Sequence, residues 1–334
     1  MLDIIIPTYK NKKGLIRTLE SIDFNEEIKV TVVDDGSNLM YYDIIDQFPE
    51  INFYYKRANS GPGITRQVGI NITNNSYIMF LDTGDYFIEK NIIYDILETI
   101  KNNPDIYLFS WQHLENGTPA DESHVRLHGR VFSRTFIQEN HITFSKEGSY
   151  INEDVGFNRC VRLFLKNYKQ QENNSHKKII LKPIVVWDRT DPNSITRKNN
   201  GQILREKQNW GFAINAMHSL KIARKGHVSK TIIMEEISEV MIGLYYYFLR
   251  TLIEAPTYIQ NAWDGAKLFY DKEFSKLTTI DPLYLEFVKK HMIKQLHDKI
   301  KNFDFPVPIN INRFLEELKN PQVPIFYLQT IDSN

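Results

Sequence analysis

The fold is decided by the stretch Tyr77-Ile78-Met79-Phe80-Leu81-Asp82-Thr83-Gly84-Asp85-Tyr86-Phe87, a short apolar run that ends in two carboxylates around a glycine. Apolar runs of this length, bounded by turn residues, are typical of a buried central strand in a parallel sheet. In open α/β sheets, ligands bind at the carboxyl ends of strands, where Asp82 and Asp85 would lie. Two acids on such a turn could hold a divalent cation, which would favour a phosphorylated ligand. Taken alone, the segment could equally be a solvated Asp-Gly turn.

Strand-like and helix-like patterns alternate before and after this stretch. Strands are predicted at residues 2–6, 30–33 and 51–56, and apolar residues at helical spacing separate them. A repeated β-α order calls for right-handed crossovers and a mostly parallel sheet flanked by helices. The predicted fold class is therefore α/β. Residues 112–130 are polar, and we expect a loop or hairpin there, beside the site.

Polar residues follow several of these predicted strands. Asp34-Asp35-Gly36-Ser37 ends the second strand, and a glycine-rich loop from Ala58 to Gly63 leads into a helix that carries Arg66. Backbone donors at such a helix start favour anions, and an arginine can grip phosphate oxygens in a bidentate manner. The glycine spacing is neither that of a P-loop nor that of a dinucleotide fingerprint. These strand ends therefore suit a nucleotide of another class.

Two further polar segments are candidates for the same site. Glu153 and Asp154 stand in front of a predicted helix, although acids in a first helical turn are often only partners of the helix dipole. The loop after Trp187 contains Arg189 and Ser194.

The bulk composition excludes several classes of protein. The 334 residues contain 41 Lys+Arg and 41 Asp+Glu, so no global basic field points to nucleic acid or to an anionic membrane. The single cysteine, Cys160, excludes an internal disulfide framework and fits a reducing compartment. The longest apolar stretch, residues 240–249, is too short to span a bilayer. We expect a cytoplasmic protein without a transmembrane segment, which could still be peripheral to a membrane.

The pattern becomes mainly helical after about residue 202. Apolar stripes at helical spacing lie within residues 235–252 and 284–300, and they are interpreted as core packing or as a partner face. The change of composition predicts two domains, 1–204 for the nucleotide and the chemistry and 205–334 for an acceptor site or oligomerisation. A homodimer through the C-terminal helices is plausible.

Taken together, the N-terminal segments resemble the family 2 glycosyltransferases with the GT-A fold, over roughly residues 1–200. The resemblance rests on five segments: Ile6-Pro7-Thr8-Tyr9, Val33-Asp34-Asp35-Gly36-Ser37, the Gly61-to-Gly69 segment with Arg66-Gln67-Val68-Gly69-Ile70 in place of the family's usual Arg-Asn-x-Gly-Leu/Ile, Phe80-Leu81-Asp82-Thr83-Gly84-Asp85, and Glu153-Asp154. Each segment alone is a weak pattern, whereas five in this order are specific. The resemblance implies an inverting transferase that uses a nucleotide-sugar donor.

The resemblance also implies roles for individual residues. Pro7, Tyr9 and Asp35 would line the base and ribose of the donor, with Asp35 accepting a hydrogen bond from the base. Arg66 would lie near the diphosphate or the donor sugar. Asp154 would be the general base that deprotonates the acceptor hydroxyl, and Glu153 would orient it or contact the acceptor. The same predicted donor site includes Thr8, Asp34, Gly61, Asp82, Thr83, Arg189 and Ser194.

The metal motif departs from the family pattern. Asp82 matches the first acid of the family's Asp-x-Asp motif, which holds Mn²⁺ or Mg²⁺ against the diphosphate, but Gly84 stands where the second acid is usual. Either Asp85 takes over part of the cation's shell or the site binds metal weakly. A histidine that some relatives use as a further ligand has no counterpart after Trp187. Arg189 and Ser194 could contact phosphate there instead. His128 could contact the acceptor or could be a bystander, as a lone loop histidine often is.

The leading hypothesis is transfer of a sugar from a UDP-sugar to a hydroxyl acceptor, a bacterial cell-surface glycan or its precursor. One alternative is a phage enzyme that glycosylates hydroxymethylated DNA bases, with Lys289, Lys290, Lys294, Lys299 and Lys301 as candidate phosphate contacts. Zero net charge disfavours a DNA partner. Another alternative, motivated by Gly84, is a non-catalytic nucleotide-sugar binding protein.

Overall fold

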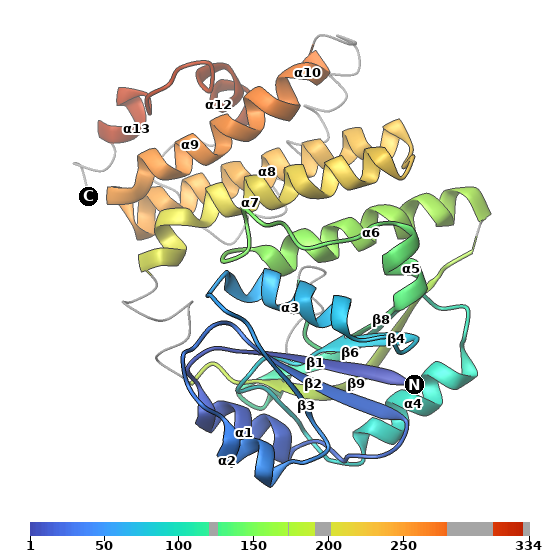
Figure 1. The fold of residues 1–334 in the computed structure, drawn as a ribbon. Coiled ribbons are helices and arrows are strands. Elements are labelled where there is room, and N and C mark those ends of the chain that lie inside the picture. The colour runs from blue at the N-terminus through green and yellow to red at the C-terminus, as the bar shows by residue number, and fades with distance from the viewer. Residues whose placement is uncertain (120–125, 173, 191–201, 279–309, 330–334) are drawn as a thin grey trace. The chain divides into compact units, whose positions relative to one another are not determined.

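The structure, a computed structural model, describes residues 1–119, 126–172, 174–190, 202–278 and 310–329 (Figure 1). The chain divides into two compact units, Met1–Pro192 and Asn193–Asn334. The predicted boundary between residues 204 and 205 falls just inside a helix that begins at Gln202. Ser194, the predicted helix at 284–300 and the five candidate DNA-contacting lysines lie outside the described residues.

The first unit is a sheet with helices on both faces. Its strands are β1 (Leu2–Thr8), β2 (Ile28–Asp34), β3 (Asn52–Tyr55), β4 (Tyr77–Phe80), β5 (Tyr86–Phe87), β6 (Leu108–Glu115), β7 (Thr118–Pro119), β8 (Arg130–Ser133) and β9 (Lys177–Trp187). Its helices are α1 (Lys12–Glu20), α2 (Tyr42–Gln47), α3 (Gly61–Ile72), α4 (Ile92–Asn102), α5 (Arg134–Glu139) and α6 (Glu153–Glu172).

The sheet is mixed, with the strand order β3-β2-β1-β4-β8-β6-β9-β5 and β7 paired to β6. The predicted α/β fold is confirmed, and β3, β2, β1 and β4 are parallel as expected. Beyond β4 the sheet changes character, because β8 is antiparallel to both β4 and β6. β6 and β8, which precede and follow residues 116–129, are thus antiparallel to each other. The antiparallel pair of β5 with β9 was not predicted.

Apolar side chains hold the helices on the sheet, with α1, α2 and α4 on one face and α3 and α6 on the other (Figure 1). The core under α1, α2 and α4 includes Ile4, Val32, Leu15 and Ile96, all fully buried. On the opposite face α3 approaches β1 closely. A Cβ atom at Gly69 would lie 2.3 Å from Cγ2 of Ile5, so only glycine fits there without movement.

The second unit is helical. Its described elements are α7 (Gln202–Lys225), α8 (Lys230–Glu254), a 3₁₀ turn (Pro256–Tyr258), α9 (Ile259–Phe269), a π-helical turn (Tyr270–Phe274), α10 (Ser275–Thr278), α12 (Ile311–Glu317) and α13 (Ile325–Gln329). A Cβ at Gly265 would lie 2.6 Å from backbone atoms of Asn209, so α7 and α9 pack at close range. None of the described helices combines the length and the apolar character needed to cross a bilayer.

Candidate active site

The turn after β4 presents two acids, and α1 holds it in place. The hydroxyl of Thr18 accepts a hydrogen bond from the Gly84 amide at 2.9 Å and donates to the carbonyl of Asp85 at 2.7 Å. Gly84 has φ +105°, a conformation that L side chains rarely adopt. This backbone conformation explains why glycine replaces an acid here. Asp85, one residue later, comes close to Asp82 instead.

Arg66, on α3, joins this turn to the start of α6. Its guanidinium donates to both carboxylate oxygens of Asp82, at 2.7 and 2.8 Å, and to Oε1 of Glu153 at 2.8 Å. The arginine is buried, with 4% of its surface exposed. Burial alone would lower the pKa of Arg66, but the charges of Asp82 and Glu153 raise it. The Arg66 side chain thus connects the turn at Asp82, 16 residues away along the chain, with the start of α6 at Glu153, 87 residues away.

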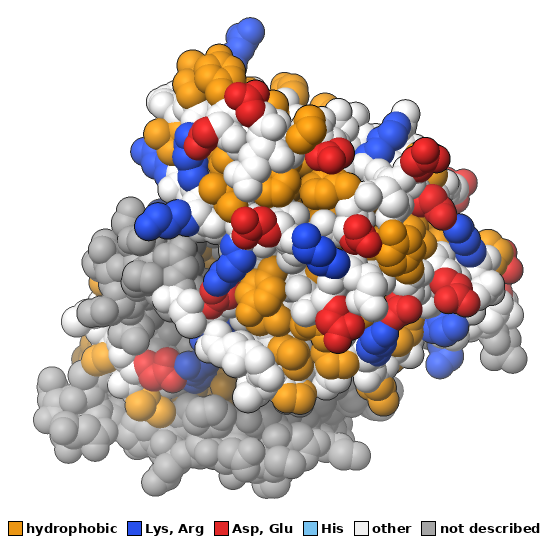
Figure 2. All heavy atoms as spheres, turned by 90° about the horizontal axis from the view of Figure 1, so that it is seen from below, with side chains coloured by type: hydrophobic (Ala, Val, Ile, Leu, Met, Phe, Trp, Pro, Cys, Tyr) orange, Lys and Arg blue, Asp and Glu red, His pale blue; other side chains and the backbone are white. Residues whose placement is uncertain are grey.

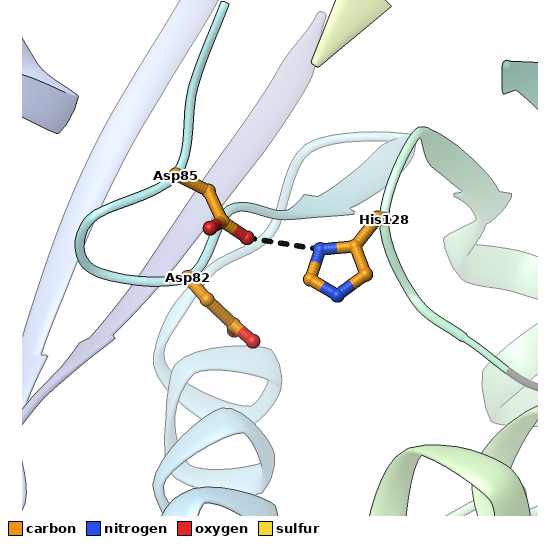
Figure 3. Close-up of side chains that lie close together, drawn as sticks. All are labelled: Asp82, Asp85 and His128. Atoms are coloured by element: carbon orange, nitrogen blue, oxygen red, sulfur yellow. Dashed lines mark ion pairs between the residues drawn. The ribbon is translucent and has the colours of Figure 1, made fainter. Parts of the chain in front are cut away.

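His128 completes a cluster with the two acids of the turn (Figure 3). Its Nδ1 lies 2.9 Å from Oδ2 of Asp85, and ligand atoms of Asp82, Asp85 and His128 all lie within 4.8 Å of one another. Burial lowers the pKa of His128, but the charges of Asp85 and Asp82 raise it overall. Burial raises the pKa of Asp85, although the charge of His128 acts in the opposite direction. Burial would also raise the pKa of Asp82, but the charges of Arg66 and His128 lower it overall.

These three residues fit a divalent cation by their chemistry. Two carboxylates and one imidazole are donors that proteins commonly offer to such ions. A carboxylate has about four lone-pair sites, so Asp82 keeps an acceptor position beyond its three bonds from Arg66. The sequence predicted Asp82 and Asp85 as ligands and His128 as an acceptor contact. The structure places His128 beside the predicted ligands.

Glu153 and Asp154 open α6, as the sequence predicted. Burial, followed by the charge of Asp154, raises the pKa of Glu153 to about 7. Burial also raises the pKa of Asp154, whereas Arg66 and His128 act in the opposite direction. The structure therefore brings the acids of α6 into the electrostatic environment of the Asp82 turn.

The predicted donor-binding loops lie at the ends of β1 and β2, and here the acids have partners within the chain. Asp35 accepts hydrogen bonds from the amides of Ser60 and Gly61, both at 2.9 Å, and pairs with Lys56. Asp34 accepts from the amide of Ser37 at 2.9 Å. Both acids therefore order the loops of the predicted nucleotide site. The role of Asp35 toward the base stays a prediction.

The remaining predicted residues of the donor site differ in exposure. Tyr9 is 45% exposed, whereas Thr8 is buried. The hydroxyl of Thr83 donates to the carbonyl of Pro7 at 2.8 Å and so ties the Asp82 turn to the end of β1. Gly61 has φ +85°, and a Cβ atom there would lie 2.8 Å from the carbonyl oxygen of Ser149.

Three residues near this site were not singled out from the sequence. Lys56 holds Asp35, while Trp187 and His113 pack around His128, with ring centroids 5.1 and 5.6 Å from its imidazole. Burial, followed by the charge of His128, lowers the pKa of His113 to about 4. No pattern in the sequence marks these residues, because strands distant along the chain bring them together. Arg189, a predicted phosphate contact, lies 4.8 Å from the Trp187 ring.

Comparison with known proteins finds similarity to glycosyltransferases. The family described as "Glycosyl transferase family 2" matches residues 3–161. The chain is 30% identical over 110 residues to a processive diacylglycerol beta-glycosyltransferase of Mycoplasma genitalium, a match covering 30% of this chain and 32% of that protein. It is 34% identical over 115 residues to the minor teichoic acid biosynthesis protein GgaA of Bacillus subtilis, covering 28% of this chain and 24% of GgaA. The matched part is thus about a third or less of these two relatives.

Solved structures share the fold. The crystal structure of TarS from S. aureus aligns with 99% of this chain and 55% of its own, with a TM-score of 0.66 and 15% sequence identity. Its fragment 1–349 in complex with UDP aligns over 80% of both chains, with a TM-score of 0.59 and 17% identity. The fold is accordingly GT-A, followed by a helical part. Residues 3–161 therefore form a glycosyl transferase family 2 domain.

Proposed function

We propose that this chain transfers a sugar from a UDP-sugar to a hydroxyl group of an acceptor, with inversion at the anomeric carbon. The observation that carries the proposal is the bridge made by Arg66 between Asp82 and Glu153. This bridge holds the acids at the start of α6 against the turn after β4. A base on one side and cationic groups on the other are what an inverting displacement of a nucleoside diphosphate requires.

Asp154 is the general base in this proposal. It lies at the first turn of α6, and its Oδ1 accepts a hydrogen bond from the amide of Val155 at 2.8 Å. The raised pKa of Asp154 makes its carboxylate a better proton acceptor than an ordinary aspartate. Glu153, fixed by Arg66, sets the position of the helix start and with it the position of the base.

Mn²⁺ or Mg²⁺ would be held by Asp82, Asp85 and His128. When bound, such an ion neutralises charge that develops on the leaving diphosphate. Arg66 contributes a fixed positive charge to the same region. Asp35 and Lys56, coupled to the glycine loop, shape the nucleotide end of the site.

The acceptor we propose is a cell-surface glycan or its precursor. GgaA is a minor teichoic acid biosynthesis protein, and TarS of Staphylococcus aureus is a poly(ribitol-phosphate) beta-N-acetylglucosaminyltransferase, 25% identical to this chain over 170 residues. TarS has also been solved with UDP and with UDP-GlcNAc, which supports a UDP-sugar as donor. Basic and acidic side chains are interspersed on the face shown in Figure 2, so that face offers no extended basic field for DNA.

The test is Asp154→Asn, assayed for sugar transfer and for UDP affinity. We expect transfer to fall by about 10²–10⁴-fold, the usual contribution of a positioned base. UDP affinity should remain, because Asp154 does not build the donor pocket in this proposal. Asp46→Asn, which changes an exposed acid on α2, is the matched control and should retain activity. If the unaltered protein binds UDP-sugars but neither hydrolyses nor transfers them with any divalent cation, the chain is a nucleotide-sugar binding protein.

A further inference from the structure

Two arginines pack against one tryptophan beside the predicted cation site. The guanidinium carbon of Arg126 lies 3.9 Å from the ring centroid of Trp187, and that of Arg189 lies 4.8 Å from it. Glu115 accepts a hydrogen bond from each guanidinium, at 2.7 Å from Arg126 and 3.1 Å from Arg189. We refer to Arg126, Arg189, Trp187 and Glu115 as the arginine clamp.

The sheet itself aligns the parts of the clamp. Glu115 ends β6, Trp187 ends β9, and the two residues are opposite each other in the parallel pair. Register shifts on either side of Gln112 produce this alignment. The backbone amide of Arg189 also donates to the side chain of Asn116 at 3.1 Å. The clamp is therefore built on strand ends.

The clamp has the charge and the exposure of an anion site. Its side chains carry two positive charges and one negative charge. The side chains of Arg126 and Arg189 are 31% and 47% exposed, so both guanidiniums reach solvent. A guanidinium has five N–H donors in a rigid fork that matches phosphate oxygens. Stacking on Trp187 holds the forks in place, which lowers the entropy lost on binding.

The arginine clamp lies next to the turn that carries Asp82 and Asp85. The imidazole of His128 stacks on Trp187 at 5.1 Å and also contacts Asp85. One ring thus separates the clamp from the turn where the donor diphosphate is proposed to bind. At the same turn, Arg66 pairs with Asp82 and also with Glu153. An anion at the clamp would be a neighbour of the donor.

We propose that the arginine clamp binds a phosphate group of the acceptor, so that the acceptor is a phosphate-bearing polyol or glycan. The inference rests on the proposed transferase function and specifies its acceptor class. A phosphate group could come from the acceptor or from the donor diphosphate, and the experiment separates these two sources.

The experiment measures binding of two probes to the 334-residue chain by calorimetry. One probe is a synthetic glycerol-phosphate trimer, measured with UDP present, and the other is UDP alone. We expect Arg189→Gln and Arg126→Gln each to weaken trimer binding by about tenfold or more, or about 1.4 kcal/mol, because each variant loses charge-assisted hydrogen bonds to the phosphate. UDP affinity should change by less than about twofold, which corresponds to about 0.4 kcal/mol.

Two further variants sharpen the result. Arg189→Lys keeps the charge but loses the fork, and we expect an affinity for the trimer between those of the unaltered chain and Arg189→Gln. Lys101→Gln removes an exposed charge that is paired with Glu27 and precedes β6, whereas the clamp includes Glu115 at the far end of that strand. This control should leave trimer binding unchanged. The melting temperature of each variant is measured, and binding is compared only among variants that melt at the same temperature as the unaltered chain.

The outcomes are distinct. Weaker trimer binding with intact UDP binding supports the proposal. Weaker UDP binding with intact trimer binding assigns the clamp to the donor and overturns it. A chain that binds UDP but not the trimer also overturns it, while leaving the transferase proposal standing. A chain that binds neither probe contradicts both proposals.

Discussion

At the scale of single residues, Arg66 and His128 pair with the acids of the candidate site. Asp82, Asp85, Glu153 and Asp154 lie in recognisable segments, and the structure places all four around Arg66 and His128. The place of His128 beside Asp85 could not be predicted. Its segment has no apolar periodicity, and its position depends on β8 reversing direction beside β6.

His128 permits a test of the predicted cation site. We expect His128→Gln to weaken Mn²⁺ binding by at least about tenfold, because even partners outside the ligand shell are worth about 10–100-fold in affinity. The measurement is calorimetric titration with Mn²⁺ in the presence of UDP. His141→Asn is the control, since His141 is exposed with φ +52° and asparagine tolerates that conformation. Equal Mn²⁺ affinity in His128→Gln and the unaltered chain would remove His128 from the ligand set.

The environment of Asp154 predicts the pH dependence of the reaction. A general base must be deprotonated, so kcat/KM should fall as the pH drops through the pKa of Asp154. Because burial raises that pKa, the acid limb should lie above the ordinary aspartate value of about 3.9. A profile of kcat/KM against pH measures the limb directly. Activity that stays flat down to about pH 4 would contradict the assignment of Asp154 as the base.

At the scale of secondary-structure elements, apolar periodicity predicted the parallel half of the sheet and the helices that cover it. The antiparallel half depends on pairings between distant segments, which periodicity does not report. β5 has only two residues, Tyr86 and Phe87, and its pairing with β9 requires the turn that Gly84 permits. Short strands of this kind carry too little pattern to be recognised before the fold is known.

The packing of α3 on β1 gives a prediction about stability. Gly69→Ala adds a methyl group 2.3 Å from Ile5, and overpacking costs about 1–3 kcal/mol, against a gain of about 1 kcal/mol in helix propensity. We expect a net loss of stability, measured as a lower urea midpoint. Asn71→Ala, at an exposed position of the same helix, raises propensity without this contact and should not destabilise.

The source of the Gly69→Ala effect is checked by combining it with Ile5→Ala. If the clash causes the loss, the double variant should be more stable than the sum of the single changes predicts, with a coupling of about 0.5–3 kcal/mol. Strict additivity would show that the methyl groups do not interact.

At the scale of the whole molecule, each unit has a core of its own. The core under α1, α2 and α4 is formed by residues from Leu2 to Val185. In the second unit, Trp263 packs with the rings of Phe248, Phe314 and Tyr327. The domain boundary placed between residues 204 and 205 from the change in composition near residues 200–205 stays a prediction. The function of the second unit, as acceptor site or as dimer interface, stays a prediction.

We expect the N-terminal part to bind donor without the helical part. A chain that ends at residue 204 contains every residue predicted for the donor site, and the core of the first unit lies within it. Its Kd for UDP should lie within about threefold of that of the full chain, a difference below 1 kcal/mol. Calorimetry on both proteins gives the comparison. A folded fragment, verified by circular dichroism, that fails to bind UDP would place part of the donor site beyond residue 204.

The bridge made by Arg66 has a consequence for how this site can decay over evolutionary time. The carboxylate of the turn and the carboxylate of the helix depend on the same guanidinium. A single substitution of Arg66 would therefore remove the partner of Asp82 and of Glu153 at once, even if the other motifs were unchanged. Gene copies that drift away from catalysis should be recognisable by the loss of this arginine.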